Sequence, residues 1–390
     1  LSVAPVAGGE FREIFRSNTP VINGVIATFD PSTLENDSYI LRFEAHDNGG
    51  NVSAVEQTVN VAGELKLGNF RLSFTDLEIP VAGIPISVTR TYDTLTTNTR
   101  DDFGYGWRLE FRDTDLRTSL KPDTVNQELG IPTVGFENGT RVYITQPGGK
   151  REGFTFRPKP MTNVDGVNLG AFANYLYVPE FVPDKGVTSK LSVPEVTLMR
   201  NPSTNQFHQA NRPYNPASSF FGGKYTLTTS GGIVYEIDGT TGDLLTATDT
   251  NGNKLTYTDA GIFSDSGKQV TFERDAQGRI VSVLDPMGNK ISYGYDALSN
   301  LVKVTDQEQR ETKFVYDGQK AHYLKEIIDP LGRTGAKTEY DENGRLKQVI
   351  NGANVPINIE YNPSESIQIV KDADNNPTIY KYDERGNVLQ

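Results

Sequence analysis

Apolar and polar residues alternate in short runs along most of this chain, a pattern that predicts β-strands rather than helices. Near the N-terminus, Tyr39, Leu41, Phe43 and Ala45 alternate with mostly polar residues, as in a strand with one buried face. A turn-forming cluster at residues 47–51 follows, and a second alternating run comes after it. We interpret residues 1–62 as the back part of a β-sandwich domain, and we expect its missing strands to lie upstream.

The next segment, residues 63–118, contains a dense series of strand signals. Residues 84, 86, 88, 90 and 92 share one face at the period of two that a strand requires. Residues 103–107 then combine three aromatic side chains with two glycines. This cluster predicts an aromatic plug of the core at a tight bend, in preference to a platform on which a ligand stacks.

Residues 119–222 give the weakest pattern, with frequent prolines and strand-like islands at 140–145 and 192–199. We interpret them as an irregular β insertion. From residue 223 to the end, short alternating strands follow one another regularly.

A Tyr-Asp pair marks this regular part of the chain. The second residues of successive pairs are separated by 21, 21, 24, 21 and 21 positions. The pairs are Arg274-Asp275, Tyr295-Asp296, Tyr316-Asp317, Tyr340-Asp341, Tyr361-Asn362 and Tyr382-Asp383. A period of that length indicates one supersecondary unit copied in series.

Two turn signals in each unit predict that the unit is a β-hairpin. One signal is Asp-x-x-Gly and the other is Asp-Pro-x-Gly, in which proline presets φ, aspartate bonds to the following backbone and glycine accepts a positive φ. The turn glycines are Gly278, Gly288, Gly332, Gly344 and Gly386. Their spacing leaves strands of about six residues, so the hairpins are expected to pair edge to edge in one long antiparallel sheet.

Side-chain phase differs between the two strands of each hairpin. In the strand that leads into the Tyr-Asp pair the apolar residues alternate strictly, which predicts a ladder of tyrosines on one face. In the return strand the apolar residues are three apart, as in Ile280 and Val283. An odd spacing cannot keep two residues on one face of a regular strand. Either a β-bulge resets the phase in every copy, or both faces of the sheet are partly covered.

The amino-acid composition excludes several classes of function. The net charge of −12 argues against a protein that tracks nucleic-acid phosphates. The absence of cysteine excludes disulfides and thiolate chemistry. No apolar run reaches the roughly 20 residues that a membrane-spanning helix needs, so no membrane insertion is expected.

The three histidines are far apart, and the Asp-rich stretches at 47–51, 249–253 and 372–376 are better explained as hairpin turns than as calcium loops. We therefore predict no catalytic residue, no metal and no cofactor.

The Tyr-Asp, Asp-x-x-Gly and Asp-Pro-x-Gly register of residues 223–390 resembles the YD-repeat, or Rhs (rearrangement hot spot), family. The upstream run that includes residues 68–70, 80–86, 91–93 and 103–107 is similar to the segment that opens Rhs shells. The resemblance implies a large secreted or surface protein of bacteria. It also implies repeats that spiral into a hollow β-shell, which in polymorphic toxins encloses a C-terminal toxic domain.

The sequence therefore predicts an all-β chain in four segments. These are a partial Ig-like sandwich (1–62), the Rhs opening strands (63–118), an irregular β insertion (119–222) and the hairpin repeats (223–390). The expected function is structural: a shell portion that encapsulates or displays a C-terminal effector of the same polypeptide, and any catalytic domain would follow the repeats. The alternative is a secreted or cell-surface adhesion module that binds cell-surface carbohydrate.

Overall fold

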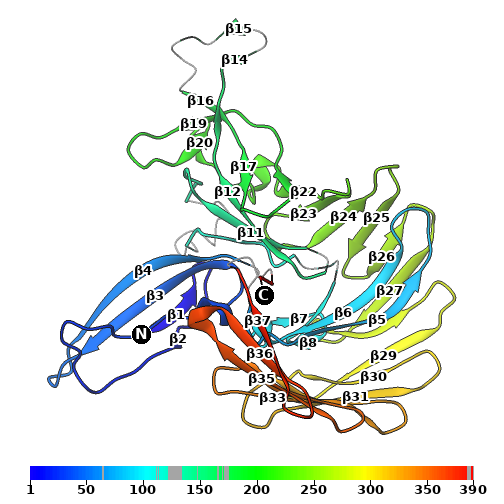
Figure 1. Ribbon diagram of the computed structural model, residues 1–390. Coiled ribbons are helices and arrows are strands. Elements are labelled where there is room, and N and C mark those ends of the chain that lie inside the picture. The colour runs from blue at the N-terminus through cyan, green and yellow to red at the C-terminus, as the bar shows by residue number, and fades with distance from the viewer. Residues whose placement is uncertain are drawn as a thin grey trace. The chain divides into compact units, whose positions relative to one another are not determined.

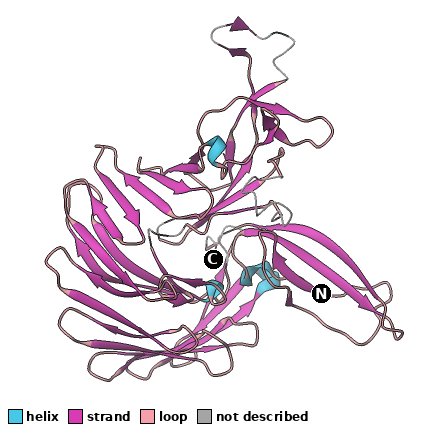
Figure 2. Cartoon of the chain, turned by 180° about the vertical axis from the view of Figure 1, so that it is seen from behind, coloured by secondary structure: helices cyan, strands magenta, loops and turns pink. Residues whose placement is uncertain are grey.

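The computed structural model describes residues 1–63, 66–110, 112, 114–121, 134–146, 148–164, 167–168, 170, 175–383 and 388–389. Nearly all of its elements are β-strands, with short 3-10 turns between some of them (Figures 1 and 2). In the described part of the chain, no helix is long and apolar enough to span a membrane. The all-β prediction is confirmed.

The chain divides into two compact units. Unit 1 contains Leu1–Phe29, Asn36–Ala62 and Thr114–Leu245, and unit 2 contains Asp30–Glu35, Gly63–Asp113 and Thr246–Gln390. Each unit therefore collects segments that are far apart in the sequence.

Unit 1 begins with an antiparallel sheet in the order β2-β1-β3-β4. Its strands are β1 (Ser2–Pro5), β2 (Arg12–Glu13), β3 (Asp37–His46) and β4 (Val52–Val61). The two long strands are buried only near their base, at Tyr39 and Val61, whereas Val55 near the tip is 69% exposed. The two strands expected here are confirmed. The first 62 residues form one sheet, so the second layer of a sandwich stays a prediction.

The remainder of unit 1 consists of short strands around an aromatic core. One sheet joins β10 (Arg117–Thr118), β11 (Arg141–Thr145), β12 (Arg151–Phe156) and β17 (Phe181–Pro183), and a second joins β13 (Lys159–Pro160), β16 (Leu176–Val178), β19 (Leu198–Arg200), β20 (Phe207–Gln209) and β21 (Arg212–Pro213). A two-stranded ribbon joins β14 (Asn163–Val164) and β15 (Val167–Asn168). The rings of Phe136, Phe156 and Tyr214 meet in the core. The strand expected at 140–145 is confirmed.

The strand expected at 192–199 is wrong as a single element. Its ends belong to β18 (Lys190–Ser192) and to β19, which lie in different sheets. Pro194 interrupts the run because it has no backbone N–H to give to a ladder.

One antiparallel sheet of 17 strands contains all the repeats, as the edge-to-edge pairing of hairpins predicted. From β22 onward its strands follow chain order. They are β18, β22 (Lys224–Thr228), β23 (Val234–Asp238), β24 (Leu244–Thr248), β25 (Lys254–Thr258), β26 (Gly261–Ser264), β27 (Gln269–Arg274), β28 (Ile280–Leu284), β29 (Lys290–Tyr295), β30 (Leu301–Thr305), β31 (Glu311–Tyr316), β32 (Leu324–Ile328), β33 (Thr334–Tyr340), β34 (Leu346–Asn351), β35 (Pro356–Asn362), β36 (Ile367–Lys371) and β37 (Pro377–Lys381).

In unit 2, a segment that we call the strap, residues 66–110, packs on one face of the repeats. It contains β5 (Arg71–Ile79), β6 (Ile86–Asp93) and β9 (Trp107–Leu109), which form a sheet, and the short pair β7 (Arg100–Asp101) and β8 (Gly104–Tyr105). In Figure 1, β5 and β6 run along the inner side of the curve that the repeat strands make. Phe103 and Trp107 are fully buried, so the predicted aromatic plug is confirmed.

The hairpin turns share one design. In the Asp285 turn, Oδ1 accepts hydrogen bonds from the amides of Met287 (2.8 Å) and Asn289 (2.9 Å). The Asp-rich stretches that begin at Asp47, Asp249 and Asp372 use their first carboxylate in the same way, which confirms that they are turns.

The residue before the last position of each turn has a positive φ. It is a glycine at Gly278 (83°), Gly288 (86°), Gly332 (77°) and Gly344 (83°). The prediction for these four glycines is confirmed, and Gly386 lies outside the described residues.

Gly278 and Gly344 provide a matched test of this geometry. Both have a φ of 83°, but a Cβ at Gly278 would meet nothing within 4 Å, whereas a Cβ at Gly344 would lie 2.3 Å from the hydroxyl of Tyr323. We expect Gly278→Ala to lower the free energy of unfolding by about 1–2 kcal/mol, the cost of the left-handed conformation. Gly344→Ala is expected to cost more. Urea denaturation measures both, and equal losses would show that the contact with Tyr323 is irrelevant.

Candidate functional site: a ladder of tyrosines and β-bulges

A β-bulge occurs beside the Tyr-Asp position in four successive copies. In the first copy Glu273 faces Ser282 and Arg274 faces Ile280, which leaves Val281 unpaired. The same register shift occurs at Gly294/Tyr295, Val315/Tyr316 and Glu339/Tyr340. The extra residue explains the odd apolar spacing, because Ile280 and Val283 are both fully buried. Of the two alternatives left by the sequence, the bulge is confirmed for these copies.

Four tyrosines of the ladder bind the bulge of the copy before them. The hydroxyl of Tyr295 donates to the carbonyl of Ile280 (2.5 Å), and Ile280 is the first residue of the bulged strand one copy earlier. The equivalent bonds are Tyr316 to Leu301 (2.8 Å), Tyr340 to Leu324 (2.8 Å) and Tyr361 to Leu346 (2.5 Å). A buried carbonyl needs a hydrogen-bond partner, and here the next repeat supplies it.

The hairpin that follows Tyr361 shows what happens without a bulge. Strands β35 and β36 pair regularly, with Tyr361 opposite Gln368 and Asn362 opposite Ile367. The next tyrosine, Tyr382, donates to the side-chain Oε1 of Gln368 (3.2 Å) instead of to a backbone carbonyl. The expectation of a bulge in every copy is therefore wrong for this copy. Its turn differs as well, because Ser366 rather than Glu365 takes the positive φ.

The tyrosines contact the neighbouring repeats through their hydroxyl groups and not through ring stacking. Among the ring contacts of the described residues, none joins two successive tyrosines of the ladder. Burial raises the pKa of Tyr295, Tyr316, Tyr340 and Tyr361 well above the ordinary value of 10.0. Each hydroxyl is protonated at neutral pH, as an ordinary tyrosine is, and the raised pKa keeps it a donor at alkaline pH as well.

The aspartate of each pair closes the turn that follows the tyrosine. Asp296 Oδ1 accepts from the amides of Leu298 (2.9 Å) and Asn300 (2.8 Å). Asp317 and Asp341 bind the amides of their own turns in the same way. For Asp383, most of the turn (384–387) lies outside the described residues.

The three-residue slip in the period has a local cause. The turn that begins at Asp317 closes onto Tyr323, six positions on, whereas the turn at Asp296 closes onto Asn300, four positions on. The third extra residue is Gly335, which is the unpaired residue of a second bulge, between β32 and β33. The insertions leave the bond from Tyr340 to Leu324 in place.

The strap supplies partners for the amides at the bulges. The amide of Ile280 donates to Asp102 O (2.8 Å), and that of Leu346 donates to Gly68 O (2.9 Å). The amide of Leu324 donates to the hydroxyl of Tyr92 (2.8 Å). In the remaining bulged copy, the strap amide of Tyr105 donates to Ser299 O (3.2 Å). In three of the four bulged copies, the strap thus pairs the amide of the first residue of the bulged strand, and the next tyrosine pairs the carbonyl of the same residue.

A buried charge joins the strap to the repeats. Arg90, 2% exposed, donates from Nε to Asp76 Oδ2 (2.7 Å), and the hydroxyl of Tyr293 donates to the same oxygen (2.9 Å). The guanidinium lies 4.5 Å from the ring centre of Phe74 and 5.1 Å from that of Phe314, close enough for cation–π attraction. Sequence reasoning had placed Arg90 on the apolar face, but it did not single out this ion pair. The signal was a charged residue in an otherwise apolar stripe.

The three histidines are divided between the two units, with His46 and His208 in unit 1 and His322 in unit 2. His322 stacks on Tyr105 with ring centres 4.0 Å apart, and its Nδ1 lies 2.7 Å from Asn300 Oδ1. Within the described ranges, no cluster of three His, Cys, Asp or Glu side chains is placed to hold a metal.

Two family models match the sequence. Residues 274–312 match the RHS Repeat, and residues 59–125 match a domain of unknown function, DUF6531. The first match covers two of the bulged copies, and the second covers the strap. Residues 274–312 therefore contain an RHS repeat, which confirms the resemblance read from the sequence.

Solved structures with low identity were also found. The crystal structure of TcdB2-TccC3 without its hypervariable C-terminal region is 11% identical, with a TM-score of 0.30, over 91% of this chain and 22% of that chain. The crystal structure of TcdB2-TccC3 is 14% identical, with a TM-score of 0.28, over 90% of this chain and 21% of that chain. The chain thus spans about a fifth of the length of these relatives. No curated protein matches the sequence.

Tyr316 and Tyr382 test the hydroxyl–carbonyl bond. We expect Tyr316→Phe to lower the free energy of unfolding by about 1–3 kcal/mol, because it leaves the buried carbonyl of Leu301 without its hydroxyl donor and the indole N–H of Trp107 without its acceptor. Tyr382→Phe is the control and should change it by less than about 0.5 kcal/mol, since this hydroxyl binds a side chain and the residue is partly exposed. Urea denaturation measures both, and equal effects would contradict a special role for the bulge carbonyl.

The turn aspartates make stability depend on pH. A side-chain hydrogen bond from Arg333, followed by its backbone amide, lowers the pKa of Asp329 below 3.8. Asn253 and Asn376 lower the pKa of Asp249 and Asp372 in the same way. The folded state therefore binds fewer protons than the unfolded chain near that pH, so stability should be retained above about pH 4 and lost as the pH falls further.

The matched variant replaces these three aspartates by asparagine. Asn351 already holds the same turn position and accepts from the amides of Ala353 (3.0 Å) and Val355 (3.0 Å), so asparagine preserves the turn. The triple variant should lose less stability than the parent between pH 5 and pH 2 in urea titrations. If the free energy of unfolding of the triple variant falls with pH as steeply as that of the parent, these carboxylates are not the source of the acid sensitivity.

Proposed function

We propose that this chain forms part of the wall of an Rhs-type β-shell that encapsulates or displays an effector segment of the same polypeptide. The observation that carries the proposal is the hydrogen bond, made in four successive copies, from a tyrosine hydroxyl to the bulge carbonyl of the preceding copy. This bond makes one hairpin the docking site for the next, so copies can be added in series without a new kind of interface.

The bulges support the same proposal through geometry. A bulge bends its strand and increases the local twist, and curvature of this kind is what a sheet needs in order to close around a volume. Four successive copies carry the bulge on the same strand of the hairpin. The repeated bend makes these copies suitable for a curved wall.

The charged groups also favour a structural role. The turn carboxylates bind their own backbone, and the buried pair of Arg90 and Asp76 joins the strap to the sheet. We infer that the chain itself performs no catalysis and that an activity would belong to the effector segment. Secretion or display at a bacterial cell surface follows from this proposal.

Native proteolysis of the whole natural polypeptide tests encapsulation. One epitope tag is placed at the N-terminus and a second within the sequence that follows the repeats. A broad-specificity protease should remove the N-terminal tag quickly and leave the second tag intact. In Tyr316→Phe, which weakens the wall, protection of the second tag should be lost at a lower urea concentration than in the parent. Loss of both tags at the same rate from the intact protein would contradict encapsulation.

A further inference from the structure

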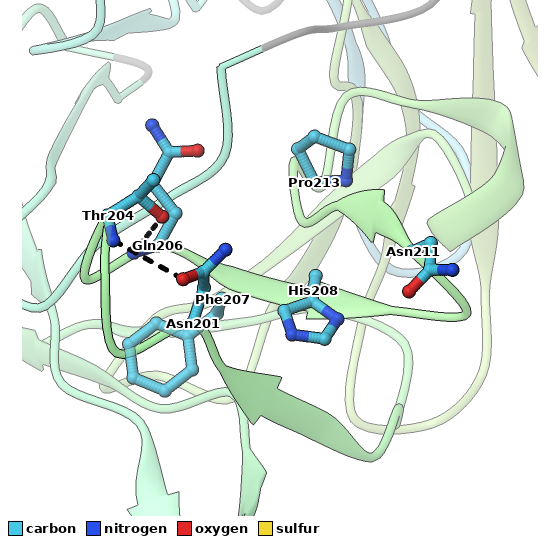
Figure 3. A pocket seen from close by; sticks show the side chains of 7 residues that line it. All are labelled: Asn201, Thr204, Gln206, Phe207, His208, Asn211 and Pro213. Carbon is cyan, nitrogen blue, oxygen red and sulfur yellow. Dashed lines mark hydrogen bonds between the residues drawn. The ribbon is translucent and has the colours of Figure 1, made fainter.

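A small polar cavity lies in unit 1, at the sheet that contains β19, β20 and β21. Its volume is about 170 Å³, and its lining residues are Asn201, Thr204, Gln206, Phe207, His208, Asn211 and Pro213 (Figure 3). Five of these seven side chains are polar, and none carries a permanent charge. The cavity lies outside the tyrosine ladder.

Asn201 has one end of its carboxamide fixed. Its Oδ1 accepts from the amides of Ser203 (2.9 Å) and Thr204 (3.3 Å), so the orientation of the group follows from its own loop. Within the described part of the chain, no hydrogen bond engages its Nδ2. The amide nitrogen is therefore an oriented donor that a ligand can use.

A strained turn carries the second carboxamide, that of Asn211. Ala210 and Asn211 have positive φ values of 49° and 61°, the geometry of the two-residue hairpin turn that joins β20 and β21. Alanine in this conformation costs about 1–2 kcal/mol. Strain of this kind persists where the surroundings fix it, and it gathers at functional sites.

His208 lies between these two carboxamides in Figure 3. Its Nδ1 is buried, and no described residue bonds to it. Its Nε2 is not among the buried atoms, so this nitrogen is the one that a ligand can reach. A buried nitrogen without a partner costs stability, and such groups in native proteins call for a functional explanation.

We propose that this cavity binds one ring of a neutral saccharide. Amides, a hydroxyl and an imidazole suit sugar hydroxyls, because a hydroxyl both donates and accepts and so matches either tautomer of His208. The lack of permanent charge on the lining disfavours phosphates and metal ions. At ~30 Å³ per water molecule, the cavity has room for about six waters, which suits one sugar ring and not a longer chain. The ring of Pro213 offers a surface for the C–H groups of the sugar. This site does not depend on the proposed shell function.

Ligand-observed NMR on the full chain tests the site with glucose, galactose, mannose and N-acetylglucosamine as probes. We expect at least one of them to bind with a Kd on the order of 1 mM. Asn211→Gly removes the carboxamide and tolerates the positive φ, while His208→Ala removes the imidazole. Each should weaken binding by about tenfold or more. His46→Ala, at an exposed histidine outside the cavity, is the matched control and should bind like the parent.

Circular dichroism first shows whether the two variants fold, and the binding results of folded variants then decide for or against the site. Binding that Asn211→Gly and His208→Ala both weaken supports the site. A glycan array then distinguishes a free sugar from the terminal sugar of a glycan, and either one fits the cavity. The proposal is overturned if none of the four sugars binds, if both variants bind as tightly as the parent, or if inorganic phosphate binds the cavity in preference to the sugars.

Discussion

The repeats of this protein depend on one hydrogen bond, from a tyrosine hydroxyl to the carbonyl at the bulge of the preceding copy. A bulge by itself is costly, because it removes backbone groups from the ladder inside a buried sheet. The tyrosine offsets that cost at the carbonyl, and burial keeps its hydroxyl protonated. The curvature that the bulge introduces is therefore retained. In the hairpin that follows Tyr361, the bulge and the tyrosine–carbonyl bond are absent together, which indicates that they depend on one another.

The strap satisfies the amides at the bulges, as the tyrosines satisfy the carbonyls. A segment 178 to 278 positions upstream reaches the bulges through Asp102, Tyr92 and Gly68. The buried pair of Arg90 and Asp76 connects this segment to the sheet through the hydroxyl of Tyr293. A buried ion pair adds little net stability, since desolvation offsets the attraction, but removing one partner is costly. Here the ion pair contributes specificity. The hydroxyl of Tyr293 donates to the same carboxylate of Asp76, and this bond aligns the strap with one particular copy. Repeats of similar sequence need such a reference point.

Much of the fold was predictable from local rules. Strand alternation, the glycines with positive φ and the aspartate turns each depend on interactions within a few residues, and all of them are found. The odd spacing of Ile280 and Val283 even indicated the bulge, although the sequence left a second explanation open. Failures occurred where a distant segment or a local substitution decided the outcome. The run at 192–199 divides between two sheets, and the hairpin after Tyr361 lacks its bulge.

The sequence by itself determined the hairpin, its period and its membership of the YD/Rhs repeats, because turn chemistry and side-chain phase are written within each 21-residue unit. Only the tertiary structure decided what the tyrosine does. The hydroxyl of Tyr316 and the carbonyl of Leu301 are 15 positions apart, and nothing in the sequence marks that carbonyl as unpaired. The partners of Arg90 and the small cavity around His208 were decided in the same way. Such contacts depend on how separate segments pack, and a local pattern carries no information about that packing.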